Sequence, residues 1–222
     1  MVSRVRSLDP VIVGMTVFLL IFGLAMLLSA TGPLAVQRTG DSLFYVKNQL
    51  VKGILPGLVG FFLLAFTDYR RWKPFAFGAL ILSIGLLLLV YIPGVGIELG
   101  GARGWVHLLG VQFQPSELVK LTFLVYLSAW LASHRGEDAH QLETGLLPFL
   151  GAVGSVMLLL ILQPDTGSMM IVVSTSLILY FLSGAPLVWF SGLCVAGAGL
   201  LAALIKFSPY RAARFMIFLR PD

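Results

Sequence analysis

Two ionisable side chains stand close together where a polar stretch meets a long apolar run. Glu117 and Lys120 are three residues apart, a spacing that puts both charges on one face of a helix. A carboxylate can accept a proton and an ammonium can hold a phosphate, so the pair suits proton transfer beside an anionic substrate. A charge at the bilayer centre costs roughly 2.5–3.5 kcal/mol on insertion scales, so the pair needs a hydrated cavity, a partner or the interface.

The same segment also fits an ordinary helix start. Pro115 suits the first helical position, Glu117 suits the first turn, and Lys120 is within reach of Glu117. Arg103, in the glycine-rich stretch just before this helix, could add a planar and permanently charged phosphate ligand. The residues alone leave the structural and the chemical interpretation open.

A second polar interruption, at residues 163–167, divides what would otherwise be one long apolar run. Pro164 and Gly167 fit a tight hairpin in which Asp165 caps the next helix. The functional hypothesis places Asp165 near Glu117 on the same membrane face.

Two arginines stand in the amphipathic segment 209–219. The apolar residues beside Arg211 and Arg214 suit an interfacial helix whose arginines extend toward water. Recognition of an anionic lipid headgroup is the competing hypothesis.

Membrane helices are the elements expected to position these residues. Hydrophobic residues make up 58% of the 222 and charged residues 11%, whereas a soluble domain has about half and about a quarter. The formal net charge is +5, but the basic residues are scattered among apolar runs, which excludes a nucleic-acid patch and favours anionic lipids. The composition predicts an all-α, polytopic membrane helical bundle.

Seven apolar runs are long enough to cross a bilayer core of about 30 Å, which needs roughly 20 helical residues. Short polar connectors separate most of them, so residues 1–222 are predicted to form a single membrane domain. The predicted spans are about 10–31, 49–67, 74–92, 116–133, 146–162, 169–183 and 186–206.

The orientation follows from the tight loop 68–73, which carries three basic residues and is cytoplasmic by the positive-inside rule. Alternation then puts the polar loop 100–115, the turn at 163–165 and the end of the chain on the outer face. Only six of the 15 Lys and Arg residues lie inside on this topology. Either the topology is inverted or a function holds the other basic residues outside.

Five motifs resemble, in order, those of the SEDS family (shape, elongation, division and sporulation), the FtsW/RodA/SpoVE group. Residues 29–30 resemble its SAS, 101–105 its GARRW, 113–120 its FQPSELxK, 163–168 its QPDLGT, and 210–221 its YRxxR…FLNP. The approach to the second motif, at 93–98, is more similar to the FtsW or division-type members.

The resemblance implies a ten-helix peptidoglycan glycosyltransferase of cell division or elongation in the bacterial cytoplasmic membrane. Such an enzyme polymerises lipid II on the outer side and works with a class B penicillin-binding protein as transpeptidase. A sugar hydroxyl attacks the anomeric carbon of the donor, and undecaprenyl pyrophosphate departs. On this resemblance the chain is the N-terminal part of the fold, truncated at the start of the large external loop.

The motifs also imply site residues. Glu117 and Lys120 are the expected catalytic pair, and the expected substrate-binding residues are Arg103, Gln114, Ser116, Gln163, Asp165, Arg211 and Arg214. Gly104 replaces the second arginine of GARRW, which removes one phosphate contact. The family's proposed base lies three residues beyond the proline that Pro221 matches, so the fragment alone is expected to be inactive. No metal site is expected from the residues, and a divalent cation is left open as a cofactor.

Two other functions compete with polymerisation. A lipid II flippase would need polar groups reachable from both membrane faces, whereas the polar residues named here gather toward one. A non-enzymatic scaffold for a transpeptidase would tolerate substitution of Glu117 and Lys120.

Overall fold

The computed structural model describes residues 8–99, 102–108, 111–134, 141–208, 211–213 and 216. Two compact units make up the chain, Met1–Arg71 and Trp72–Asp222. The single membrane domain expected from the sequence stays a prediction.

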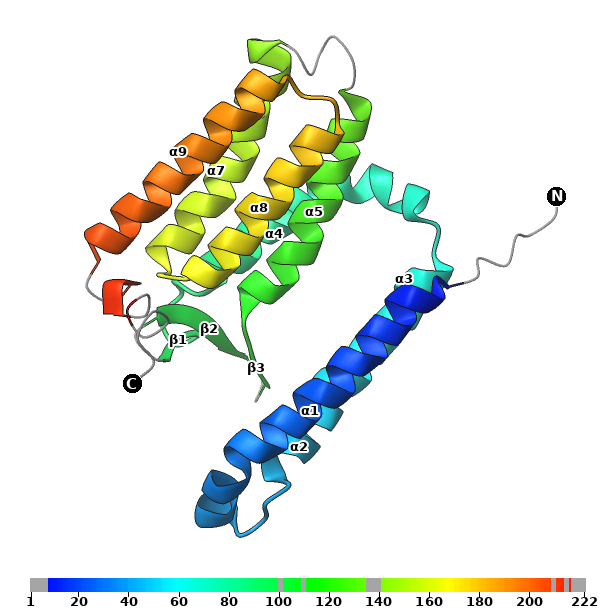
Figure 1. The fold of residues 1–222 in the computed structure, drawn as a ribbon, viewed down its shortest axis with the longest axis vertical. Helices are drawn as coiled ribbons and strands as arrows, with labels where there is room; N and C mark the ends of the chain where they lie inside the picture. The colour runs from blue at the N-terminus through cyan, green and yellow to red at the C-terminus, as the bar shows by residue number, and fades with distance from the viewer. Residues whose placement is uncertain are drawn as a thin grey trace, which may run out of the picture. The chain divides into compact units, whose positions relative to one another are not determined.

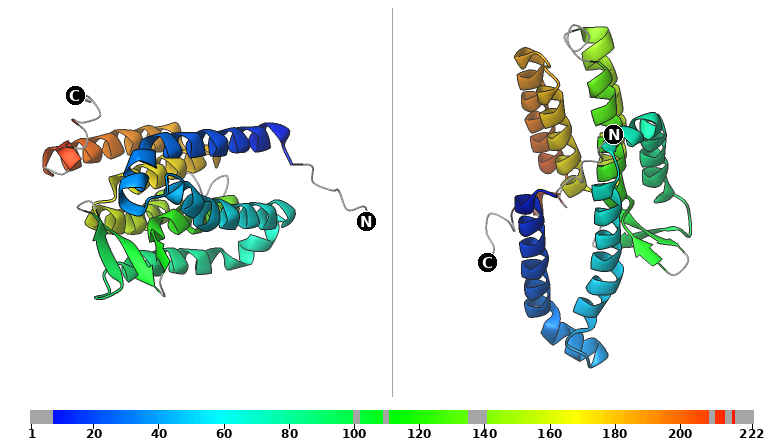
Figure 2. Two further views of the ribbon diagram at one scale, coloured as in Figure 1. Left: turned by 90° about the horizontal axis from the view of Figure 1, so that it is seen from below. Right: turned by 90° about the vertical axis from the view of Figure 1, so that its right-hand side faces the viewer.

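The first unit is a helical hairpin. Helix α1 (Pro10–Thr39) begins at Asp9, whose carboxylate accepts from the Val11 and Ile12 amides at 2.8 and 3.2 Å. The return segment consists of α2 (Phe44–Gln49), the π-helix η1 (Leu50–Ile54) and α3 (Leu55–Phe66). Figure 2 shows the two arms joined at the tip and splayed toward their other ends.

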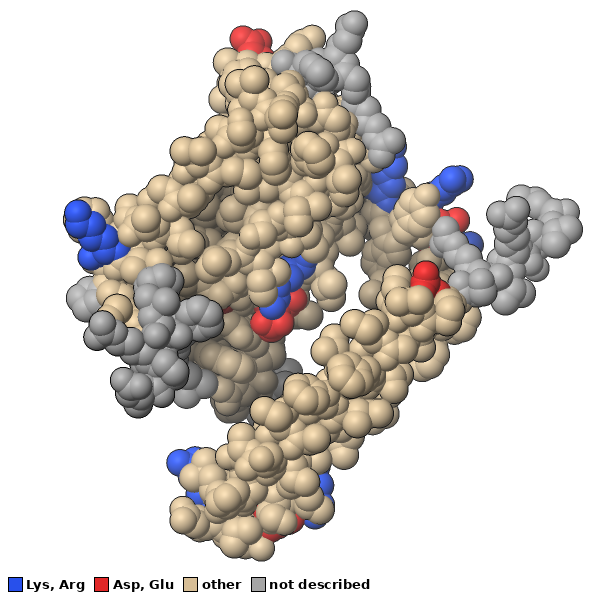
Figure 3. Space-filling view, in the orientation of Figure 1, with Lys and Arg blue, Asp and Glu red and all other residues tan. Residues whose placement is uncertain are grey.

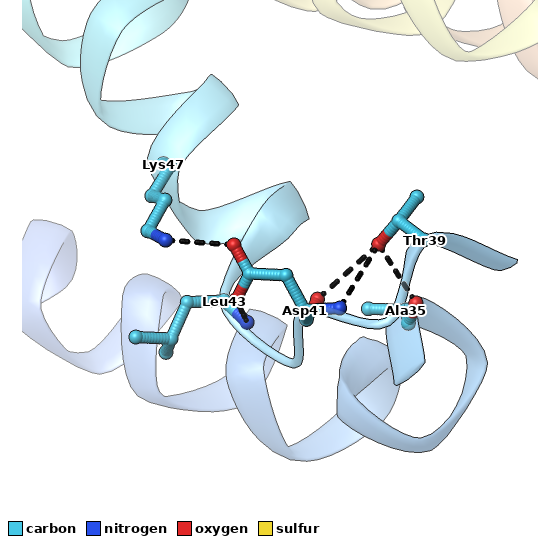
Figure 4. Close-up of polar contacts among 5 residues, drawn as sticks. All are labelled: Ala35, Thr39, Asp41, Leu43 and Lys47. Atoms are coloured by element: carbon cyan, nitrogen blue, oxygen red, sulfur yellow. Dashed lines mark hydrogen bonds and ion pairs between the residues drawn. The ribbon is translucent and has the colours of Figure 1, made fainter. Parts of the chain in front are cut away.

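A compact set of polar contacts closes the hairpin tip (Figure 4). Gly40 turns the chain with a φ of 74°, a conformation that costs glycine little. The Asp41 carboxylate accepts from the Leu43 amide at 2.9 Å and from the Lys47 ammonium at 2.7 Å. The hydrogen bond from Lys47 is the largest cause that holds the pKa of Asp41 below its ordinary value.

Proline explains the two π-helical turns. In η1 the Leu55 amide bonds to the Leu50 carbonyl, and in η3 (Leu142–Leu146) the Leu147 amide bonds to the Leu142 carbonyl. Leu55 is followed by Pro56, and Leu147 is followed by Pro148. Proline has no N–H and so cannot donate the next i→i−4 hydrogen bond of an α-helix. The helix therefore widens by one residue immediately before each proline.

A groove of about 400 Å³ lies between the arms of the hairpin, lined mostly by apolar side chains of both. Gly53 and Gly57 line it from the return arm. The Gln49 side chain covers Gly53, since a Cβ there would lie 2.7 Å from Gln49 Nε2, while Gly57 has no such neighbour within 4 Å.

The second unit is a bundle of five helices among the described residues, preceded by the 3₁₀-helix η2 (Tyr69–Phe75). In sequence order the five are α4 (Ala76–Leu89), α5 (Pro115–Ser133), α7 (Leu147–Leu162), α8 (Thr166–Leu182) and α9 (Leu187–Lys206). Helix α5 packs against α4 and α8, α7 against α4 and α8, and α9 against α8 (Figure 1).

The middle of this bundle is a core of apolar side chains. Phe123, Leu127 and Val156 are fully buried, and the rings of Phe149 and Tyr180 stack at 4.3 Å. In contrast, α9 has no buried residue. Figure 3 shows a visible surface on which charged side chains are sparse, as a chain in contact with lipid requires.

A three-stranded antiparallel sheet corrects the expectation of an irregular loop at 100–115. Strands β1 (Gly96–Leu99), β2 (Ala102–Leu108) and β3 (Val111–Phe113) pair in the order β1-β2-β3. The polar, glycine-rich composition of this stretch hid the alternation of buried Gly104 and Val106 with exposed Arg103 and His107 along β2. The sheet lies at the end of the bundle where α5 begins (Figure 1).

The helical membrane bundle predicted from the sequence is confirmed. A helical segment corresponds to each predicted span, and within the described residues five of them are long and apolar enough to cross a membrane: Pro10–Thr39, Phe44–Phe66, Tyr69–Leu89, Leu142–Leu162 and Leu187–Lys206. Helix α8 is shorter at 17 residues, and α5 carries the charged pair Glu117 and Lys120. The chain is a multi-pass membrane protein.

One hydroxyl pair joins α4 to α5, and it allows a test of the bundle. The Ser83 and Thr122 hydroxyls hydrogen-bond at 2.7 Å, and Ser83 is fully buried. We expect Ser83→Ala and Thr122→Ala to be coupled by about 0.6 kcal/mol, the usual size for such pairs in membranes. A double-mutant cycle of unfolding in detergent measures the coupling, and strictly additive effects would contradict the contact.

Candidate functional site

Asp165 lies where the starts of two helices meet. As the N-cap of α8 it accepts from the Ser168 amide through Oδ1 at 3.0 Å. Its Oδ2 accepts from Gln114 Nε2 at 2.9 Å and from Ser116 Oγ at 2.8 Å, and both residues belong to the start of α5. One half-buried carboxylate thus lies at the positive ends of two helix dipoles.

A buried hydroxyl chain continues this contact. Ser168 Oγ donates to Ser116 Oγ at 3.1 Å, and the two serines are only 5% and 1% exposed. Ser116 therefore both donates to Asp165 and accepts from Ser168. We name Gln114, Ser116, Asp165 and Ser168 the α5–α8 network.

Gln163 joins the turn between α7 and α8 to a third helix, α4. The side chain is 1% exposed, and its Nε2 donates to the Leu87 carbonyl in the last turn of α4 at 2.7 Å. Its Oε1 has no hydrogen-bond partner among the described residues. The donor side of this amide holds α4 to the α7–α8 turn, and a substrate contact of Gln163 stays a prediction.

Glu117 and Lys120 form an ion pair beside the α5–α8 network. Lys120 Nζ donates to Glu117 Oε1 at 2.7 Å. The Lys120 side chain is 20% exposed and the Glu117 side chain is 59% exposed. Glu117 directly follows Ser116, so Asp165 and Glu117 lie at the same end of α5, although no direct contact joins the two carboxylates among the described residues. The pair is the accessible charged part of the site.

Arg103 lies exposed on β2. Burial raises the pKa of Tyr91, just after α4, and the nearby charge of Arg103 opposes this rise. Neighbouring Gly104 faces inward, and a Cβ there would stand 3.8 Å from Gln114 Nε2. A longer side chain at 104 would therefore start beside Gln114 and the rest of the α5–α8 network.

Arg211 contacts the turn between α7 and α8. Its Nε donates to Thr166 Oγ1 at 3.1 Å, and its Nη2 donates to the Ile161 carbonyl at 2.9 Å. Arg214, the other arginine expected at the site, lies outside the described residues.

The structure adds partners that sequence reasoning missed. Ser168, Thr166 and the carbonyls of Leu87 and Ile161 complete the contacts of the expected residues. Ser168 stands three residues after its N-cap, the position that such a cap bonds, so a capping rule could have found it. The described chain holds no cluster of three His, Cys, Asp or Glu side chains suited to a metal ion.

The shared carboxylate predicts an unequal cost of removing two helix caps. We expect Asp165→Ala to lower the free energy of unfolding by about 1–3 kcal/mol more than Asp9→Ala, because it also leaves the donors of Gln114 and Ser116 unpaired. Asp9 is the matched control, since its carboxylate bonds only to its own helix among the described residues and a lost cap costs about 1 kcal/mol. Equal losses in denaturation measurements would contradict the role of Asp165 between helices.

Comparisons with known proteins agree with the fold and motifs. The family model of the FtsW/RodA/SpoVE proteins, described as cell cycle protein, matches residues 10–222. Stage V sporulation protein E of Bacillus subtilis (strain 168) is 33% identical over 222 residues, which cover 100% of this chain and 60% of that protein. The probable peptidoglycan glycosyltransferase FtsW of Nitrosococcus halophilus is 37% identical over 96% of this chain and 54% of that protein.

Solved structures give the same answer. The rod shape determining protein RodA of Thermus thermophilus matches with a TM-score of 0.56 and 30% identity, over 80% of this chain and 58% of that one. A chain from a peptidoglycan synthase complex that coordinates polymerization and crosslinking matches with a TM-score of 0.62 and 31% identity, over 90% and 59%. The chain thus spans less than two thirds of these relatives. It belongs to the FtsW/RodA/SpoVE family of cell cycle proteins.

Proposed function

We propose that this chain forms the N-terminal membrane part of a peptidoglycan glycosyltransferase that polymerises lipid II at the outer face of the cytoplasmic membrane. Relatives along nearly the whole chain are named probable peptidoglycan glycosyltransferase FtsW. The observation that carries the proposal is the accessible Glu117–Lys120 pair, fixed at the start of α5 by the α5–α8 network.

The chemistry proposed for this site is charge stabilisation of a departing pyrophosphate. As the sugar hydroxyl attacks the anomeric carbon, the bond to the pyrophosphate oxygen breaks and negative charge grows there. Lys120 and Arg103 are the cations proposed to meet this charge, because both are accessible at the same end of the bundle. Glu117 would hold the Lys120 ammonium in place. The base that takes the hydroxyl proton is proposed to lie in the part of the relatives' length that this chain does not span.

The remaining expected residues have less direct parts in this proposal. Gln114, Ser116 and Asp165 would shape the cavity wall, since their polar atoms bond to one another. Arg211 and Arg214 stay predictions as phosphate ligands. Participation of a divalent cation bound with the pyrophosphate stays open, and chelation during an assay would test it.

The partner proposed is a class B penicillin-binding transpeptidase. One structural relative comes from a complex that joins polymerization to crosslinking, so a partnership of this kind fits the family. A flippase is less favoured, because the described site residues lie at one end of the helices rather than along a path between both ends.

Removal of the Lys120 charge tests the proposed function. In the full-length gene product, we expect Lys120→Ala to lower the rate of lipid II polymerisation by roughly 10²-fold or more, the usual loss when one charge-stabilising group is removed. Glu117→Gln should lower it less, because Lys120 remains. Glycan chain formation from purified lipid II is the measurement.

The matched control is Lys47→Ala. Lys47 also pairs with a carboxylate at 2.7 Å, but at the hairpin tip of the other unit, and its loss should leave polymerisation unchanged. A folded and active Lys120→Ala protein would reduce the pair to a helix-end contact and favour the scaffold alternative.

A further inference from the structure

We infer that Arg211 is a positioning residue, whose guanidinium fastens the segment after α9 to the turn between α7 and α8. The inference deepens the proposed function and rests on it for its kinetic part. The contacts that carry it are the bonds from Nε to Thr166 Oγ1 and from Nη2 to the Ile161 carbonyl.

The two acceptors lie on opposite sides of the turn. Ile161 is in the last turn of α7, where carbonyls lack partners within the helix and the dipole favours a cation. Thr166 is the first residue of α8. One guanidinium therefore bridges the end of one helix and the start of the next.

This geometry suits arginine and no other cation. The guanidinium is a rigid fork with donors at fixed directions, whereas a lysine ammonium is a single point on a flexible stem. Arg211 is half-buried, and the amide of the next residue, Ala212, bonds to the Ser208 carbonyl at 2.9 Å, which fixes the backbone beside the fork. The two nitrogens of the guanidinium therefore reach both acceptors at once.

The α7–α8 turn that Arg211 contacts is also bonded to the candidate site. Asp165 bonds to the start of α5, next to Glu117, and Gln163 bonds to the end of α4. Through Thr166, Arg211 places the segment after α9 in the same frame. The described residues next to Arg211 are thereby held at a set position relative to Glu117 and Lys120.

A positioning role and a phosphate-binding role differ in kinetics. A residue that binds the substrate equally in ground and transition states raises KM when removed, whereas misplacement of reacting groups lowers kcat. We expect Arg211→Ala to lower kcat by roughly 10²-fold, the size of a misplacement of about 1 Å, with little change in KM. Arg211→Lys should fail to restore kcat, because it keeps the charge and loses the fork.

The experiment combines these kinetics with a thermal unfolding cycle on the full-length gene product. Arg211→Ala and Thr166→Val should each lower the melting temperature, and the double variant should melt close to Arg211→Ala alone, since the bond is already gone. Lys206→Ala is the matched control; it removes an exposed positive charge on α9 and should change neither quantity.

Two outcomes would overturn the inference. One is additive melting shifts of the two variants, and the other is a rise in KM for Arg211→Ala that Arg211→Lys reverses. The melting cycle needs no activity, so an inactive wild-type protein would contradict the proposed function while the contact is still tested.

Discussion

The carboxylate of Asp165 accepts hydrogen bonds from the starts of two helices, α5 and α8. Its two oxygens accept three hydrogen bonds, one from the backbone of α8 and two from side chains at the start of α5. Buried donors left without an acceptor cost about 1–3 kcal/mol each, so α5 and α8 cannot separate at this end without a large loss. The direction of α5, and with it the place of Glu117 and Lys120, depends on this contact.

Burial divides the motif residues into two groups. Ser116, Ser168 and Gln163 are almost fully buried and bond to their neighbours, whereas Glu117 and Arg103 are exposed and Lys120 is partly so. The first group sets distances between α4, α5 and α8. The second group can meet a charged molecule from outside. Both groups fall within the same short motifs because adjacent residues at a helix start face different surroundings.

The sequence predicted the helices well and the contacts between them poorly. Each of the seven apolar runs became a helical segment, since long apolar stretches have few alternatives in a bilayer. The sheet at 96–113 was missed because its polar face and glycines resemble a loop, and the π-turns were missed because they depend on where proline interrupts a helix. The proximity of Asp165 to the start of α5 was a hypothesis that spacing could not support, because 49 residues separate Ser116 from Asp165.

The pairing of these motifs changes what a motif match means for this chain. The stretch at 113–120 and the stretch at 163–168 join in one network through Gln114, Ser116, Asp165 and Ser168. A substitution at Asp165 would therefore disturb activity even if the carboxylate never touched a substrate. Loss of function at such a position reports on the fold as much as on the chemistry, and only groups that are accessible and free of this network, above all Lys120, can separate the two.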